Sequence, residues 1–144
     1  MTDGRYGHDV HQRAAFTVET SVPVASVEIN ELRSVAWPAS GLQDWDAVLG
    51  HSLGWVTAHL DRQLVGFANV AWDGGSHAFL LDTVVHPAVR RKGIGRSLVE
   101  RAAVLARDAG AEWLHVDFEP EARAFYEAAG FRPTEAGLLA LRPD

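Results

Sequence analysis

The strongest structural signal in the chain is the sequence Val84-Val85-His86-Pro87-Ala88-Val89-Arg90-Arg91-Lys92-Gly93-Ile94-Gly95-Arg96-Ser97-Leu98. An apolar run ends at its start, a basic loop follows, and two glycines open a helix. The first backbone N–H groups of a helix have no partner inside the helix, and together with the helix dipole they favour an anion. Gly93 and Gly95 would let such a ligand approach the backbone closely. The stretch therefore predicts a phosphate site that a diphosphate would fit.

Positive charge is concentrated in this stretch. Four of the 13 basic residues of the chain lie close together there, namely Arg90, Arg91, Lys92 and Arg96, although 19 acidic residues give the chain a formal net charge of -6. A solvated basic turn is the alternative explanation, but clustering against an acidic background favours an anion site. The acidic balance also argues against nonspecific nucleic-acid binding, which needs a basic surface.

Other phosphate-binding loops fit the stretch poorly. A Walker loop needs G-x-x-x-x-G-K-[ST], which is absent, and a dinucleotide fingerprint needs a third glycine where Leu98 stands. In a Rossmann turn the strand runs almost directly into glycine, whereas a basic stretch with a proline separates Val85 from Gly93. Asp117 is a poor match for the ribose-binding acid of that fold. The sequence pattern therefore argues against a nucleotide-binding redox domain.

On both sides of the loop, strand and helix patterns alternate, which is typical of an α/β or α+β fold. We expect strands at residues 16–20, 55–60, 64–72, 79–85 and 113–118, with edge or bulged strands at 131–141. A helix is expected at 95–109 with Gly110 as its cap, and a short one from Pro120 to Ala129. Two earlier helices are expected to present the apolar faces Val24, Val27, Leu32 and Val35, then Leu42, Trp45, Leu49 and Leu53.

Length and composition limit the remaining possibilities. With 144 residues and 47% hydrophobic side chains, the chain has room for one folded domain, which we place at residues 16–144 after a flexible tail at 1–15. The tail has no apolar signal region, and no apolar run is long enough to span a membrane, so the default expectation is a cytoplasmic protein with no membrane partner. The absence of cysteine excludes disulfides, thiolate metal sites and thiol nucleophiles.

The stretch from Val84 to Leu98 resembles motif A of the GNAT N-acetyltransferase superfamily. The pattern [RQ]-x-x-G-x-[GA] is matched from Arg90 to Gly95 after the V-x-P of Val85-His86-Pro87, and Ala124-Phe125-Tyr126-Glu127-Ala128-Ala129-Gly130-Phe131 looks like the second signature of the family. The resemblance implies a mixed sheet of six or seven mostly antiparallel strands flanked by about four helices. It also implies acetyl-CoA as co-substrate, held by Thr83, Val84, Val85, Arg90, Arg91, Lys92, Gly93, Ile94, Gly95, Arg96 and Ser97.

The resemblance further implies catalytic roles. Tyr126 matches the tyrosine proposed to protonate the departing CoA thiolate, and the alternative is a core aromatic. The general base stays open among His115, Asp117 and Asp82, or a bound water. Some members of the family carry a carboxylate near the position of His115. His115 and Asp82 each also have a purely structural alternative as hydrogen-bonded residues.

Acceptor recognition in the family falls mainly to the first two helices and their connection. Trp37 and Trp45 are therefore candidates to line an acceptor pocket, with core packing as the alternative. Asp82, Asp117 and Glu119 would suit a cationic amine, and Glu119 and Pro120 stand where many members carry a cofactor-binding asparagine. We predict an N-acetyltransferase acting on a primary amine of a small molecule or peptide by direct attack, with no metal and a possible homodimer. The rival is a noncatalytic acyl-CoA-binding sensor or assembly module.

Overall fold

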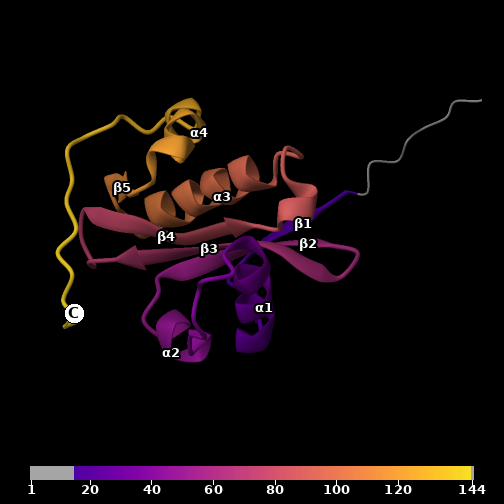
Figure 1. Ribbon diagram of the computed structural model, residues 1–144. Helices are drawn as coiled ribbons and strands as arrows, with labels where there is room; N and C mark the ends of the chain where they lie inside the picture. The colour runs from indigo at the N-terminus through magenta and orange to yellow at the C-terminus, as the bar shows by residue number, and fades with distance from the viewer. Residues whose placement is uncertain (1–14, 144) are drawn as a thin grey trace, which may run out of the picture.

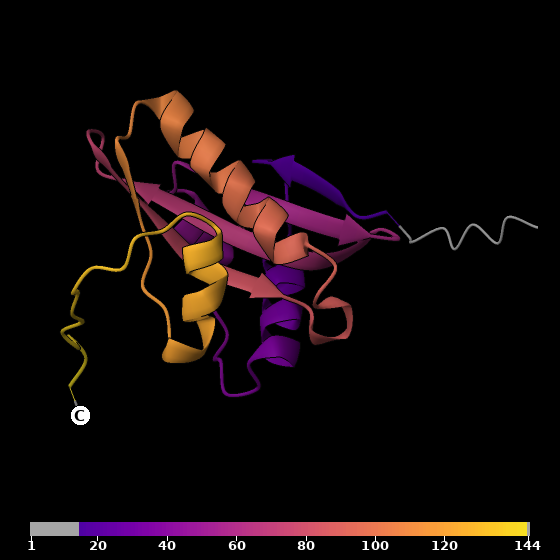
Figure 2. The ribbon, with the colours of Figure 1, turned by 90° about the horizontal axis from the view of Figure 1, so that it is seen from above.

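The computed structural model describes residues 15–143, so most of the expected tail at 1–15 lies outside the described residues. The fold is a mixed sheet between two layers of helices (Figure 1). Helices α3 and α4 cover one face, and α1 and α2 lie against the other (Figure 2). The elements are β1 (Thr17–Thr20), α1 (Ser26–Ala36), α2 (Trp45–Leu49), β2 (Gly54–Leu60), β3 (Gln63–Trp72), β4 (His77–Val85), α3 (Ile94–Ala109), β5 (Trp113–His115) and α4 (Arg123–Ala128).

The strands follow the order β1-β2-β3-β4-β5. Pairing is antiparallel from β1 to β4, whereas β5 is parallel to β4. The expected mixed α+β fold with four helices is therefore confirmed, but in residues 15–143 the sheet has five strands rather than six or seven. Residues 131–141, where edge or bulged strands were expected, form no strand, because no neighbouring strand pairs with them.

Each face of the sheet has its own apolar core. Beneath α3 and α4, residues such as Val70, Leu80 and Leu98 are buried together. Beneath α1 and α2, the core is built around Phe67 and Trp45, whose rings meet edge to face at 5.4 Å. A helix and a sheet each bury one apolar face, so this two-sided arrangement satisfies both.

The expected apolar faces of the first two helices were partly wrong. In α1 the buried residues are Ile29 and Leu32, while Val27 and Val35 are 60% and 50% exposed. Leu42 is 92% exposed because α2 begins only at Trp45, after the Asp44 side chain caps it by accepting from the Ala47 N–H at 3.2 Å. Tertiary packing against the sheet, rather than the count of apolar residues, decides which face a helix turns inward.

Helix α3 forms as the sequence predicts. It begins after Gly93 and ends at Gly110, and both glycines adopt left-handed backbone conformations, with φ of 82° and 102°. Five residues of one face, Ile94, Leu98, Val99, Ala102 and Ala106, are buried on the sheet. Within residues 15–143, none of the helices combines the length and the apolar character that a membrane span requires.

Candidate functional site

Strands β4 and β5 pair over a short stretch only and then separate. Their parallel pairing covers only His77 to Phe79 opposite Trp113 to His115. From residue 80 to 85, the β5 side of β4 therefore has no strand partner in the described chain. Thr83, Val84 and Val85, which the sequence assigned to the cofactor, lie on this part of β4, where a strand edge leaves backbone groups free to pair with a ligand.

A β-bulge shapes the same end of β4. The register against β3 shifts between Phe67 and Asn69, and Asp82 takes a left-handed φ of 58°. The extra residue reverses the alternation of side chains, since Leu80 belongs to the core beneath α3 and Val84 to the core beneath α1. As a result, the side chains of Asp82 and Thr83 lie on opposite faces of the sheet, Asp82 toward α1 and Thr83 toward α4.

The loop after β4 ends in the N-terminus of α3. The first helical hydrogen bond runs from the Ser97 N–H to the Gly93 carbonyl at 3.1 Å, so the N–H groups of residues 94–96 have no acceptor within the helix. Space around Gly93 is open, since a Cβ built there would meet no atom within 4 Å. Arg91 also has a left-handed φ, of 66°. Free N–H groups at the start of a 16-residue helix are the geometry that the predicted anion site requires.

Basic side chains surround this helix start. Arg90, Arg91 and Lys92 are exposed, and none forms an ion pair with another residue of the described chain. Arg96 binds Glu100 one turn further along α3, with 2.9 Å between its Nε and the carboxylate. Three cations therefore remain available to an anionic ligand.

Gly95 lies at the contact between α3 and α4, a packing role that the sequence did not indicate. A Cβ built on it would lie 3.3 Å from the Phe125 ring and 3.6 Å from Val85. The missing side chain thus lets α4 approach the start of α3 closely.

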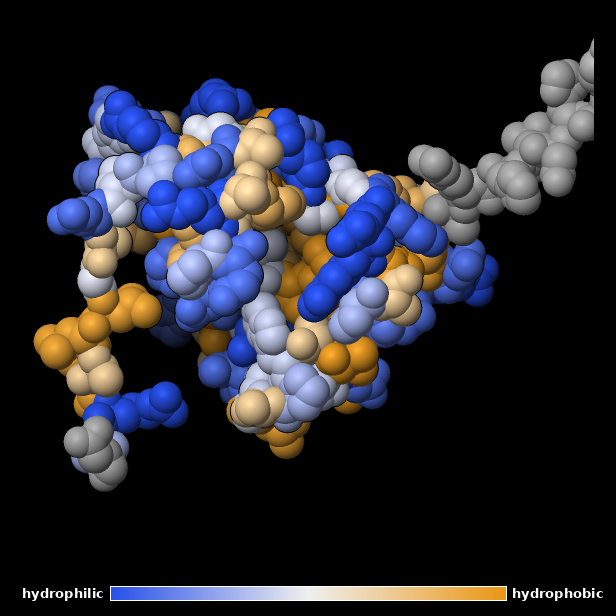
Figure 3. Space-filling view, turned by 45° about the horizontal axis from the view of Figure 1, so that its top comes forward, coloured by the Kyte–Doolittle hydropathy of each residue, from blue (hydrophilic) through white to orange (hydrophobic). Residues whose placement is uncertain are grey.

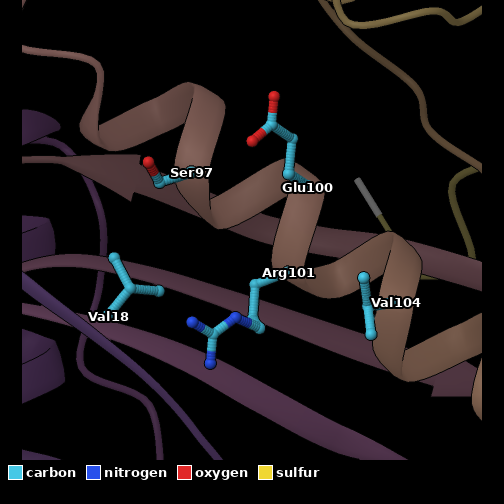
Figure 4. Close-up of a pocket in the computed structure, with 5 residues that line it drawn as sticks. All are labelled: Val18, Ser97, Glu100, Arg101 and Val104. Atoms are coloured by element: carbon cyan, nitrogen blue, oxygen red, sulfur yellow. The ribbon is translucent and has the colours of Figure 1, made fainter.

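Ser97, also assigned to the cofactor loop, lines a groove of about 250 Å³ between α3 and β1, with Val18, Glu100, Arg101 and Val104 (Figure 4).

Tyr126 of α4 lies buried beside the free part of β4. Its ring stacks on Phe118 at 5.0 Å and meets Phe125 and Phe131 edge to face. Burial raises the pKa of its phenol above the ordinary 10.0; the Thr83 hydroxyl opposes part of this rise, and the negative charge of Asp117 adds to it. Burial is the largest of these influences on the pKa of Tyr126. The Thr83 Oγ1 is itself buried and has no partner within hydrogen-bond geometry among the described residues. The phenol stays protonated at neutral pH.

Asp82 lies on the opposite face, in a polar network. Its carboxylate is 3.4 Å from Nη1 of Arg33 and accepts a hydrogen bond from the buried Asn69 amide at 3.5 Å. Ser52 in turn donates to Asn69 at 2.5 Å. Arg33 and Asn69 were not among the predicted site residues, although an asparagine in the middle of an apolar strand is a visible signal.

Two tryptophans hold the Arg33 guanidinium. It lies 5.2 Å from the Trp37 ring and 5.0 Å from the Trp45 ring, within the range of cation–π attraction. Trp45 is 2% exposed and belongs to the core, whereas Trp37 is 43% exposed at the end of α1. Of the two candidates for an acceptor pocket, only Trp37 offers a surface to a ligand.

His115 is not brought together with Asp82 and Tyr126. It pairs with Phe79 in the sheet, four residues before Thr83, which corresponds to about 13 Å along a strand. Its Nε2 is 2.7 Å from Nδ1 of His77, and its ring stacks on Phe79 at 4.7 Å. Asp117 and Glu119 are exposed in the segment between β5 and α4. No three histidine or acidic side chains within residues 15–143 are arranged to hold a metal ion.

Comparison with known proteins places this geometry among acetyltransferases. The model of the acetyltransferase (GNAT) family matches residues 23–131. A GCN5-related N-acetyltransferase 1, chloroplastic, from Arabidopsis thaliana is 32% identical over 97 residues, which are 67% of this chain and 47% of that protein. A serotonin N-acetyltransferase 2 from Oryza sativa is 36% identical over 67 residues, 46% of this chain and 34% of its own length. The chain spans less than half the length of the curated relatives it matches.

Solved structures share the fold. A GNAT protein from Streptococcus pneumoniae superposes with a TM-score of 0.75 at 23% identity, covering 90% of this chain and all of that one. An aminoglycoside N-acetyltransferase in complex with CoA gives a TM-score of 0.72 at 20% identity, covering 92% of this chain and 98% of that one. Since some relatives are named as chloroplastic, the cytoplasmic location stays a prediction.

Proposed function

The chain belongs to the acetyltransferase (GNAT) family, and on this premise we propose that it transfers an acetyl group from acetyl-CoA to a primary amine of a small molecule or peptide. One observation carries the proposal: the part of β4 that lacks a partner on its β5 side in the described chain runs into the loop of residues 86–93, which ends at the free N–H groups of α3, and Tyr126 lies beside this part of β4. A protonated phenol, a strand edge and an anion site are thus available for the thioester, the arm and the diphosphate of an acyl-CoA, in that order.

The described residues fit acetyl-CoA. Its diphosphate would accept hydrogen bonds from the N–H groups of residues 91–96, in the open space at Gly93 and near Arg90, Arg91 and Lys92, which form no ion pair within residues 15–143. Its amide-containing arm would pair with the backbone of Thr83, Val84 and Val85. The same residues would then hold the thioester close to Tyr126, and proximity of this kind supplies much of the rate.

Two side chains on opposite faces of the sheet would move the protons. The neutral amine attacks the thioester carbonyl, so a C–N bond forms as the C–S bond breaks. The leaving thiolate takes the Tyr126 proton, and the proton that the new amide nitrogen loses restores the phenol. The amine arrives as an ammonium ion, which Asp82 attracts and from which Asp82, directly or through a water, accepts a proton. The chain contains no cysteine, which supports direct attack in a ternary complex over a covalent enzyme intermediate.

The acceptor would bind on the α1 side of the sheet. Asp82 faces α1 there, and Trp37 offers an exposed ring beside Arg33. The exposed carboxylates of Asp117 and Glu119, in the segment that follows β5, add negative charge that suits a cationic amine. A small or peptide amine is preferred to a nucleic acid because the chain is acidic overall.

A second candidate function is a noncatalytic acyl-CoA-binding module. The observation in its favour is His115, which stands near the position of a base carboxylate in some members of the family and is held by His77 and Phe79 instead. Such a module would bind the phosphates of acyl-CoA with the same residues but would not catalyse acetyl transfer.

A thiol-release assay separates the two functions. The chain is incubated with acetyl-CoA and a panel of amines that includes serotonin, glucosamine 6-phosphate, an aminoglycoside and peptides with free N-termini, guided by the names of the relatives and of one structural neighbour. Acceptor-dependent release of CoA, with the acetylated amine identified by mass spectrometry, is expected. Binding of acetyl-CoA without release for any acceptor would favour the noncatalytic module, and no binding at all would overturn both.

A further inference from the structure

Arg33, in the last turn of α1, is held in one orientation. Its guanidinium lies 5.2 Å from the Trp37 ring and 5.0 Å from the Trp45 ring, and its Nη1 is 3.4 Å from Oδ1 of Asp82. The planar fork of a guanidinium matches a carboxylate in geometry, and a fork that is already fixed loses little further freedom when it binds one. Arg33 is thus preorganised for an anionic group, beside the side chain that would receive the amine.

Most of the hydrogen-bonding capacity of Arg33 is unused within residues 15–143. A guanidinium has five N–H donors, and the contact with Asp82 is the one hydrogen bond that its side chain makes to these residues. Its Nε is buried and has no partner among them. Since buried N–H groups nearly always have a partner, the guanidinium has fewer acceptors around it than its burial requires. The two oxygens of a ligand carboxylate would add acceptors for its remaining donors.

Asp82 also has room for a ligand. It accepts one hydrogen bond on each oxygen, from Arg33 and from Asn69, whereas a carboxylate offers about four acceptor positions. The Asp82 side chain is 30% exposed and that of Arg33 is 18% exposed, so solvent reaches both members of the ion pair. An ammonium group could therefore bind Asp82 while Arg33 stays in place.

The surroundings of the pair suit a small ligand. In Figure 3, apolar residues (orange) show between α4 and the loop before α3, and α1 lies below them. The thioester that we place beside Tyr126 and an acceptor held at α1 would meet on this face of the molecule. Trp37, which is 43% exposed, would cover the acceptor from the end of α1.

We propose that the acceptor is an α-amino acid, whose ammonium group binds Asp82 while its carboxylate binds Arg33. The inference rests on the proposed function and narrows its acceptor to an amine with an anionic group close by. The facing atoms of Arg33 and Asp82 are 3.4 Å apart, so a ligand that lies along the pair needs its two charges at a similarly short spacing. In an α-amino acid the amine nitrogen and the carboxylate carbon are about 2.5 Å apart. A polyamine or the N-terminus of a peptide has no such anion.

Matched acceptors measure recognition of the carboxylate. Each common L-amino acid is compared with its own primary amide, which keeps the amine and removes the negative charge. With acetyl-CoA, kcat/KM of the preferred amino acid is expected to exceed that of its amide by at least about tenfold, the scale of a hydrogen bond to a charged group. Arg33→Gln should bring this ratio close to one. Comparing the ratio between the two proteins cancels the difference in intrinsic reactivity between the two amines.

Two further variants distinguish recognition from a structural role. Arg33→Lys keeps the charge but not the planar fork, so it should retain part of the ratio. Arg107→Gln, an exposed change at the far end of α3, is the matched control and should keep the ratio of the wild type. If Arg33 only tied α1 to the sheet, Arg33→Gln would lower the rates with acid and amide equally. Circular dichroism of each variant reports whether the fold is kept.

Calorimetry separates this inference from the proposed function. The complex with CoA is titrated with the amino acid and with its amide, and the wild type, but not Arg33→Gln, should bind the acid at least about tenfold more tightly. Such binding without any acetyl transfer would support the Arg33 site and contradict the proposed function. Transfer with no preference for acids over amides, or a preference that survives Arg33→Gln, would overturn this inference alone. So would a preference for glucosamine 6-phosphate over glucosamine in the absence of one for amino acids.

Discussion

Tyr126 is placed where its hydroxyl can serve the leaving group of the proposed reaction. The ring is held by three aromatic neighbours, which Tyr126→Phe would leave in place. We expect this variant to lower kcat by about a hundredfold, the scale of a lost general acid, with little change in the dissociation constant of acetyl-CoA. Steady-state kinetics and calorimetry measure the two quantities. An unchanged kcat would remove Tyr126 from the mechanism.

The raised pKa of Tyr126 predicts how stability depends on pH. Because burial raises the pKa in the folded state above the ordinary 10.0, the folded chain holds this proton more tightly than the unfolded chain. The resulting stabilisation is fully present below about pH 10 and is lost as pH rises through the folded pKa. Urea unfolding of the wild type should therefore show a falling free energy of unfolding above about pH 10, and Tyr126→Phe a shallower fall. Identical pH profiles would contradict the assignment.

Asp82 differs from Asp117 in position, which gives a matched pair of variants. Asp82→Asn should lower kcat/KM by at least about tenfold at neutral pH, and the loss should shrink as pH rises and the amine deprotonates without help. Asp117→Asn, at an exposed site after β5, should cost much less. Measurements of kcat/KM across pH test this expectation. If Asp82→Asn and Asp117→Asn lost the same kcat/KM and had parallel pH profiles, Asp82 would not be the proton acceptor.

At the scale of elements, the start of α3 can be tested against a turn of the same geometry. Gly93 and Gly74 have φ of 82° and 83°, and a Cβ built on either meets no atom within 4 Å. The left-handed backbone should therefore cost aspartate about 1–2 kcal/mol at either position, and at Gly93 the dipole of α3 should offset part of that cost. Only Gly93→Asp places a carboxylate among the free N–H groups of α3, so only this variant should lose affinity for CoA.

Calorimetry with CoA and thermal unfolding of both variants measure the two effects separately. Equal affinities in Gly93→Asp and Gly74→Asp would refute the phosphate site. Gly95 is the less clean test, because a side chain there would also press on Phe125 at 3.3 Å and disturb the contact between α3 and α4.

The same contrast between elements explains what the sequence could predict. The loop, α3 and the position of Tyr126 depend on local signals, namely glycine conformations, helical spacing and a short motif, and these predictions agree with the structure. The bulge at Asp82, the early end of β5 and the pairing of His115 with His77 depend on register between distant strands, which no local pattern encodes. Residues 131–141 have the β pattern but lack a partner strand among residues 15–143.

At the scale of the whole molecule, charge is divided between the phosphate loop and the rest of the chain. The net charge is -6, yet Arg90, Arg91 and Lys92 are exposed and unpaired in the described chain, beside the start of α3. An anionic carrier is therefore repelled by most of the surface and attracted at one place. For the proposed reaction, this arrangement would favour correct orientation of acetyl-CoA before contact.

Salt should therefore weaken CoA binding. Exposed charges are screened over about 8–10 Å at physiological ionic strength, so the affinity for CoA should fall steadily as salt is added, whereas the affinity for an acetylated pantetheine without phosphates should stay nearly constant. Arg91→Gln should reduce the salt dependence, and Arg107→Gln, an exposed change at the far end of α3, should not. Calorimetric titrations at several salt concentrations measure these slopes. If Arg91→Gln and Arg107→Gln gave the same slope, the loop would not supply the attraction, and since the net charge of -6 cannot supply it either, the phosphate site would have to lie elsewhere.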